Sequence, residues 1–230
     1  MTRTGIRLGL VDSGLPPGFC RDEVPACRFV QDDTGAVQQI PVVPDPLGHG
    51  TTVSAILRHH GPEAMLYNAQ VFDAKGVTTA ATVAAAIDWL VAVRVDVINL
   101  SLGLQQDRTV LREACARAVA ADIILIASAP AQGAAVYPAQ YPGVIRATGD
   151  ARCAVAEISW LDSGQADFGA CPRALDQARD DPPRIGGASL GAAHLSGQVA
   201  AYLQAGGTRE RLWEDLVSRA QYVHSERRIK

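Results

Sequence analysis

The sequence lacks the features that mark several large classes of protein. Its 230 residues carry 21 Lys and Arg against 24 Asp and Glu, a net charge of −3, which argues against a nucleic-acid partner. No apolar run approaches the roughly 18 residues of a membrane span, so we expect no membrane partner. No glycine-rich phosphate loop or dinucleotide fingerprint follows an expected strand, which argues against a nucleotide-binding protein.

Cysteine is also scarce. The five cysteines are an odd number without the spacing of metal ligands, which is typical of a protein from a reducing compartment. The first apolar run starts at residue 6 and does not resemble the apolar core of a signal peptide. We therefore expect a cytoplasmic protein with no cofactor and no metal ion, and no acidic cluster favours calcium.

Apolar residues make up 48% of the chain and fall into two kinds of pattern. Short apolar runs predict buried strands at residues 6–11, 65–72, 95–100, 123–127, 144–148 and 155–160. Helical periodicity predicts helices at residues 49–59, 79–93, 107–120, 190–203 and 209–220. Polar, Pro-rich composition predicts a loop carrying a hairpin at residues 16–47 and a surface loop at residues 169–183. Strands alternating with helices indicate a single domain, residues 1–230, with a mostly parallel sheet flanked by helices.

Three reactive side chains lie at the ends of expected elements, where α/β folds carry their sites. Asp12 closes the first strand within Asp-Ser-Gly, which is also a common turn signal. His49 lies between two glycines at the start of a helix. Ser189 begins the apolar helix, where free N–H groups and the helix dipole favour negative charge, although an N-cap is the simpler interpretation.

These three residue types are the parts of an acyl-transfer site. A serine hydroxyl needs a base, and a histidine, with an ordinary pKa near 6.5, is suited to that role near neutral pH. The histidine in turn needs a carboxylate that fixes its tautomer. Three other histidines have simpler interpretations: His59 and His60 as charged residues in the last turn of a helix, and His194 as a buried structural residue.

Five stretches occur in the order in which they occur in the subtilisin-like serine peptidases. They resemble the family's Asp, His, substrate-pairing, post-oxyanion and Ser motifs, respectively: Val11-Asp12-Ser13-Gly14, Gly48-His49-Gly50-Thr51-Thr52-Val53, Asn99-Leu100-Ser101-Leu102-Gly103, Tyr137-Pro138 with Tyr141-Pro142-Gly143, and Gly187-Ala188-Ser189-Leu190-Gly191-Ala192-Ala193-His194. The resemblance extends from about residue 6 to residue 203.

The resemblance implies a subtilisin-like three-layer fold and a serine endopeptidase acting through an acyl-enzyme. Ser189 would attack the peptide carbonyl, His49 would act as base and then acid, and Asp12 would orient His49. The substrate-binding residues would be of two kinds: a segment that pairs with the peptide as an added strand (Ser101, Leu102 and Gly103) and a pocket wall (Ala127, Ser128 and Ala129).

The chain departs from the family pattern at the donor that stabilises the oxyanion. The family has an Asn where residue counting places Ala131, and Gln132 follows it. Either Gln132 supplies the amide through a shifted loop, beside the Ser189 N–H, or another donor does. In subtilisin the loss of this donor costs about 2.7–4 kcal/mol. The alternative function is therefore a subtilase-like pseudoenzyme that binds extended peptides without turnover.

The short chain and its expected compartment favour a specific processing protease over a digestive one. It resembles the small subtilases of peptide-maturation systems, such as the enzyme that removes the leader peptide of the quinohemoprotein amine dehydrogenase γ subunit. The expected partner is a peptide or protein substrate, such as one specific precursor. Its contacts are expected in the loops at residues 16–47 and 169–183. The second loop and the residue directly after it carry Arg173, Arg179, Arg184, Asp176, Asp180 and Asp181, which suit either a peptide-binding lid or a solvated surface.

Overall fold

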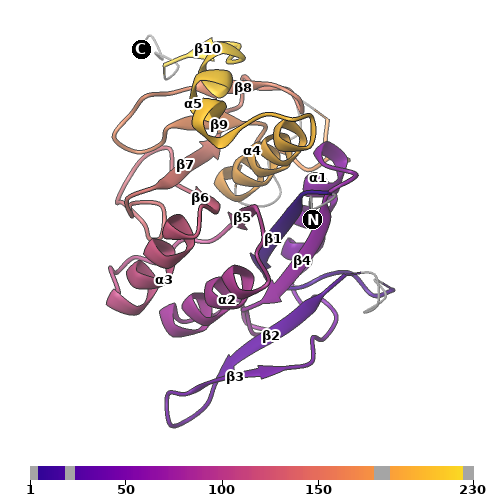
Figure 1. Cartoon of the computed structure of the whole chain (residues 1–230), viewed down its shortest axis with the longest axis vertical. Helices are drawn as coiled ribbons and strands as arrows, with labels where there is room; N and C mark the ends of the chain where they lie inside the picture. The colour runs from indigo at the N-terminus through magenta and orange to yellow at the C-terminus, as the bar shows by residue number, and fades with distance from the viewer. Residues whose placement is uncertain (1–4, 19–23, 179–186, 225–230) are drawn as a thin grey trace.

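A ten-stranded sheet forms the centre of the molecule (Figure 1). The structure is a computed structural model that describes residues 5–18, 24–178 and 187–224. The strands in chain order are β1 (Arg7–Asp12), β2 (Ala26–Gln31), β3 (Val37–Ile40), β4 (Met65–Gln70), β5 (Val97–Leu100), β6 (Ile124–Ser128), β7 (Val144–Gly149), β8 (Ile158–Trp160), β9 (Phe168–Ala170) and β10 (Tyr222–Val223). Their order in the sheet is β10-β8-β9-β7-β6-β5-β1-β4-β2-β3. The β2–β3 and β8–β9 pairs are antiparallel and all other pairs are parallel.

Helices cover both faces of this sheet. They are α1 (His49–His60), α2 (Ala80–Ala92), α3 (Thr109–Ala120), α4 (Gly187–Gln204) and α5 (Arg209–Ser218). The helices α1 and α4 pack together on one face, and α2 and α3 pack together on the other (Figure 1). Each face has its own apolar core, built by alternate residues of the strands. The expected three-layer, mostly parallel α/β fold is confirmed. Within the described parts of the chain, no helix is long and apolar enough to cross a membrane.

The sequence patterns located most elements within a few residues, including the hairpin formed by β2 and β3. The surface loop expected from residue 169 is wrong at its start, because Gly169 and Ala170 belong to the buried strand β9. A bulkier residue does not fit at Gly169, where a Cβ would lie 2.4 Å from Ser159 Oγ. The short strands β9 and β10 were missed, since three-residue and two-residue strands carry almost no periodic signal. Residues 179–186 of the expected loop lie outside the described residues.

Two histidines join the helices α1 and α4. His60 Nε2 lies 2.8 Å from His194 Nδ1, and His194 Nε2 lies 2.9 Å from the Arg173 carbonyl oxygen. A carbonyl only accepts, so His194 Nε2 carries a proton, its Nδ1 accepts, and His60 Nε2 donates. The buried, structural role expected for His194 agrees with these contacts.

The charged capping role expected for His60 is wrong. Burial, with the neighbouring rings of His194 and His59, lowers the pKa of His60 to about 3, so the ring is neutral at physiological pH. Burial also lowers the pKa of His194. The backbone N–H of Gly61, which donates to the Leu57 carbonyl at 2.9 Å, closes the end of α1 instead.

This histidine pair predicts that acid weakens the fold. Unfolded His60 takes up a proton below pH 6.5 and folded His60 does not, so stability is full above pH 6.5 and is lost as the pH falls towards 3. The expected contribution is up to about 1 kcal/mol per pH unit, allowing for solvent screening. In urea melts between pH 7 and pH 4.5, His60→Gln, which retains an N–H donor, should show a shallower pH dependence. His224→Gln, which changes an exposed histidine outside this pair, is the control. An unchanged slope in His60→Gln would contradict this assignment.

Candidate active site

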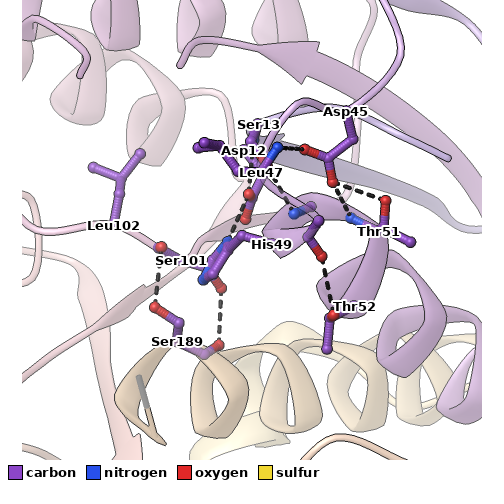
Figure 2. A network of polar contacts seen from close by, with 12 residues as sticks. Asp12, Ser13, Asp45, Leu47, His49, Thr51, Thr52, Ser101, Leu102 and Ser189 are labelled. Atoms are coloured by element: carbon purple, nitrogen blue, oxygen red, sulfur yellow. Dashed lines mark hydrogen bonds and ion pairs between the residues drawn. The ribbon is translucent and has the colours of Figure 1, made fainter. Parts of the chain in front are cut away.

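The first pair of candidate residues lies in direct contact at the end of β1. Asp12 is fully buried, and its Oδ1 lies 2.7 Å from His49 Nδ1 (Figure 2). The same oxygen accepts the Ser13 backbone N–H at 2.7 Å. The carboxylate is an acceptor, so His49 Nδ1 carries a proton and Nε2 is left with its lone pair. About a fifth of the His49 side chain is exposed (21%).

Glycines allow the Asp12 turn and the start of α1 to come this close. A Cβ at Gly50 would lie only 2.3 Å from the Gly14 carbonyl oxygen and 3.2 Å from Asp12 Oδ1. Gly48 has a φ of 73°, in the left-handed region that favours glycine. The Gly50 N–H then donates to Ser13 Oγ at 2.9 Å, which ties the helix start to the turn. The two glycines around His49 therefore have a steric purpose.

Asp45 is a second carboxylate near His49, which the sequence analysis missed. Its Oδ2 accepts from the backbone N–H and the hydroxyl of Thr51, both at 2.8 Å, at the start of α1 (Figure 2). Burial opposes its charge, but the donors of Thr51, Ser13 and Leu47 outweigh this and lower the pKa of Asp45. An acid four residues before the helix start is the signal that could have revealed it.

The two carboxylates set the charge preference of the histidine. Burial disfavours the charged ring, yet the hydrogen bond and charge of Asp12, with the charge of Asp45, raise the pKa of His49 above its ordinary value of 6.5. The stabilised imidazolium is the form that a general base becomes once it has taken a proton. The site therefore favours the product of proton transfer.

Ser189 is the third residue of α4 and lies half-buried beside the segment that follows β5. Its Oγ donates to the Ser101 carbonyl oxygen at 3.2 Å, and Ser101 Oγ donates to the Ser189 carbonyl oxygen at 2.9 Å (Figure 2). The helix begins at Gly187, so Ser189 lies within the first turn and is not its N-cap. The structure describes both His49 and Ser189 and has no hydrogen bond between their side chains. Figure 2 shows both residues beside Ser101.

A series of hydrogen bonds between buried side chains fixes Ser101, which contacts Ser189. Ser196 Oγ donates to Asn99 Oδ1 at 3.0 Å, and Asn99 Nδ2 donates to Ser101 Oγ at 2.9 Å. All three side chains are almost completely buried, and their hydrogen bonds satisfy one another. This series fixes the Ser101 hydroxyl against the Ser189 backbone. Ser196 was missed, because one serine in an apolar helix has no distinguishing pattern.

The extended segment after β5 has two edges, and its backbone groups point to one edge and the other in turn. On one side, the Leu102 carbonyl accepts from Ser128 Oγ at 3.1 Å, and Leu104 pairs with Tyr137 through two backbone bonds of 2.7 and 2.8 Å. Backbone groups alternate in direction along an extended chain. Those of Ser101 and Gly103 therefore face the other side, where Ser101 meets Ser189. Ala127, Ser128 and Ala129 are buried at the end of β6 and beyond it.

The residues expected around an oxyanion are less defined. Gln132 is exposed, and no hydrogen bond of its side chain is found within the described chain. The loop around it is attached through Gln165 Nε2, which donates to the Gly133 carbonyl at 2.9 Å. The assignment of Gln132 to an oxyanion hole therefore stays a prediction. Within the described ranges, no group of three or more His, Cys, Asp or Glu is placed to hold a metal ion.

Comparisons with known proteins agree with this geometry. A family model described as the subtilase family matches residues 3–225. Subtilisin of Bacillus pumilus is 27% identical over 221 residues, covering 88% of this chain and 78% of that protein. Minor extracellular protease Epr of Bacillus subtilis (strain 168) is 29% identical over 157 residues, 63% of this chain. The match covers 23% of Epr, and 40% of subtilisin E from the same strain, so this chain spans less than half the length of these relatives.

The fold has a counterpart among solved structures. The crystal structure of a lanthipeptide protease superimposes with a TM-score of 0.65 at 19% sequence identity, covering 90% of this chain and 74% of that chain. An identity this low supports the subtilisin-like fold and not a shared substrate. The family model covers nearly the whole sequence, and the fold is independently matched. The chain belongs to the subtilase family.

Proposed function

We propose that this protein is a serine endopeptidase whose catalytic residues are Asp12, His49 and Ser189. The observation that carries the proposal is the 2.7 Å contact between buried Asp12 and His49 Nδ1, which leaves Nε2 free to act as a base. Ser189 lies on an adjacent helix, and among the described residues its hydroxyl donates to the Ser101 carbonyl. The proposal requires that a rotation of the Ser189 side chain exchange this acceptor for His49 Nε2.

The proposed mechanism follows from these groups. Ser189 Oγ attacks the peptide carbonyl as its proton passes to His49 Nε2, and the imidazolium is stabilised by Asp12 and Asp45. His49 then gives the proton to the leaving amine, which departs and leaves an acyl-enzyme. Water, deprotonated by His49, hydrolyses the acyl-enzyme. The Ser189 N–H and Gln132 are proposed as donors to the oxyanion.

The substrate is proposed to bind as an extended strand. The backbone groups of Ser101 and Gly103 face the Ser189 side, while those of Leu102 and Leu104 are engaged on the other. A peptide that adds to this edge brings one carbonyl next to Ser189. Leu102, Ala127, Ser128 and Ala129 would then contribute through the shape of the surrounding pocket and not through backbone pairing.

We further propose a specific processing role, in which the protein removes a leader from a precursor peptide in the cytoplasm. The described cysteines, Cys27, Cys115, Cys153 and Cys171, are all free, which supports a reducing compartment. A precursor peptide is compatible with the structural neighbour, a lanthipeptide protease, although the low identity to that protein supports the shared fold alone. The quinohemoprotein amine dehydrogenase γ subunit is one candidate precursor. Broad digestion of unfolded casein by the purified protein would contradict a narrow role.

The first prediction concerns the nucleophile. A fluorophosphonate should form one adduct per molecule, and peptide mapping should place it on Ser189. Ser189→Ala should form none, and Ser218→Ala, which alters an exposed helix serine, should label normally. If the folded wild-type protein is not labelled, it is a pseudoenzyme or needs a partner for activity. The Ser189–Ser101 hydrogen bond and the Ala at position 131 favour this second candidate function.

The second prediction concerns pH. The neutral form of His49 is the base, so the labelling rate should rise with pH through a midpoint above 6.5, the direction in which Asp12 shifts the pKa. Asp12→Asn removes the negative charge that stabilises the imidazolium. It should lower the pKa of His49, measured by NMR titration, and slow labelling by about 10⁴-fold. Asp33→Asn, in the exposed hairpin turn, is the control. An equal His49 pKa in Asp12→Asn and the wild type would refute the pairing.

The third prediction concerns the oxyanion. If Gln132 supplies the missing amide, Gln132→Ala should slow labelling and peptide hydrolysis by about 10²–10³-fold, as the loss of this donor does in subtilisin. Gln39→Ala, on the edge strand β3, should react at the wild-type rate. A full rate in Gln132→Ala would assign the oxyanion to the Ser189 N–H and a different donor.

A further inference from the structure

We call residues 101–103 the paired segment. In the proposed binding mode, its pairing with the substrate determines on which side each substrate side chain lies. In an antiparallel pair, two residues that face each other place their side chains on the same face of the sheet. In the proposed binding mode, the residue whose carbonyl is attacked, P1, is the one that pairs with Ser101, because the Ser101 carbonyl oxygen lies 3.2 Å from Ser189 Oγ. The P1 side chain therefore shares a face with the side chains at positions 101 and 103. Position 103 is a glycine, so this residue places no side chain of its own on that face.

The side chain of Val136 fills the space next to Gly103. Leu104 and Tyr137 form an antiparallel bridge, which places the residue before Tyr137 on the same face as Gly103. A Cβ built on Gly103 would lie 2.9 Å from Val136 Cγ2 and 3.1 Å from Val136 Cβ. The isopropyl group thus covers Gly103 with no room for even a methyl group. Val136 is only half-buried, so part of it remains open to the surface.

The expected pocket wall, residues 127–129, is held next to the paired segment. The Ser128 hydroxyl donates to the Leu102 carbonyl, which ties the end of β6 to the paired segment. Ala127 and Ala129 flank Ser128, are fully buried and have small side chains. Of these residues, Val136 has the largest side chain, and it limits the space beside Gly103.

We propose that Val136 determines the P1 specificity, restricting P1 to a small residue such as Gly, Ala or Ser. A short side chain lies over the Ser101–Gly103 backbone without reaching the isopropyl group. A long or aromatic side chain would have to cross Gly103, where Val136 already lies. This inference rests on the proposed function and adds the substrate class: peptides with a small residue before the cleaved bond.

The test uses peptide phosphonates, which react with an active serine and carry a chosen P1 side chain. Rates of inactivation are measured with tripeptide diphenyl phosphonates that end in the Ala or the Phe analogue. The wild-type protein should react at least about 10-fold faster with the Ala probe, since pocket fit is worth about 10- to 200-fold per methylene. Val136→Gly and Val136→Ala should raise the Phe rate by about 10-fold or more and change the Ala rate little. Val110→Ala, an exposed valine on α3, is the matched control.

Several results would overturn the proposal. It fails if the wild-type protein reacts equally well with both probes, and this result requires no variant. It also fails if the preference for the Ala probe is unchanged in folded Val136→Ala. A fluorophosphonate without a peptide portion separates this failure from that of the proposed function. If that reagent labels Ser189 but the two peptide probes react equally, or the preference is unchanged in Val136→Ala, only the role of Val136 is wrong. If it labels nothing, the peptidase function itself fails.

Discussion

The contact between Asp12 and His49 depends on the approach of two backbones to a distance that only glycine permits. Asp12 follows a central strand and His49 begins a helix, and the two meet because Gly50 leaves room for the Gly14 carbonyl. The rest of the site is arranged around this point. Asp45 anchors the start of α1, and Gln70 binds the Ser13 carbonyl through its Nε2 at 2.7 Å. The Ser13 N–H and His49 Nδ1 both contact Asp12 Oδ1 and offset part of the cost of burying the carboxylate, while its Oδ2 has no hydrogen-bond partner among the described residues.

The second half of the site depends on hydrogen bonds that are far apart in sequence. Ser196 on α4 reaches Asn99 on β5, and Asn99 reaches Ser101, which holds the backbone of Ser189. The helix that carries the proposed nucleophile is thereby attached to the strand that would hold the peptide. A shift of α4 against the sheet would break this chain and leave buried polar groups unsatisfied, which is costly.

Much of the fold was readable from the sequence, because buried parallel strands and amphipathic helices have strong periodic signals. The strands that were missed, β9 and β10, are too short to show a period. Asp12, His49 and Ser189 could be selected as candidates because each lies next to glycines at the end of an expected element, and their catalytic roles stay a prediction. Asp45 and Val136 were not, since their importance comes from contacts between separate segments. His60 was misread for the same reason: nothing near it in sequence reveals that His194 is its partner.

The sheet order has a consequence for how this architecture can vary. Strand β4 pairs with β1 on one side. Strand β5, which follows β4 in the chain, pairs with β1 on the other side. The connections leaving β1 and β5 therefore run to opposite sides, which makes this place the topological switch point of the sheet, where α/β proteins bind their ligands. The switch point is determined by strand order and does not depend on any loop. The surrounding loops are thus free to diverge in length and composition, and a new peptide preference can evolve while Asp12 and Ser101 remain in place.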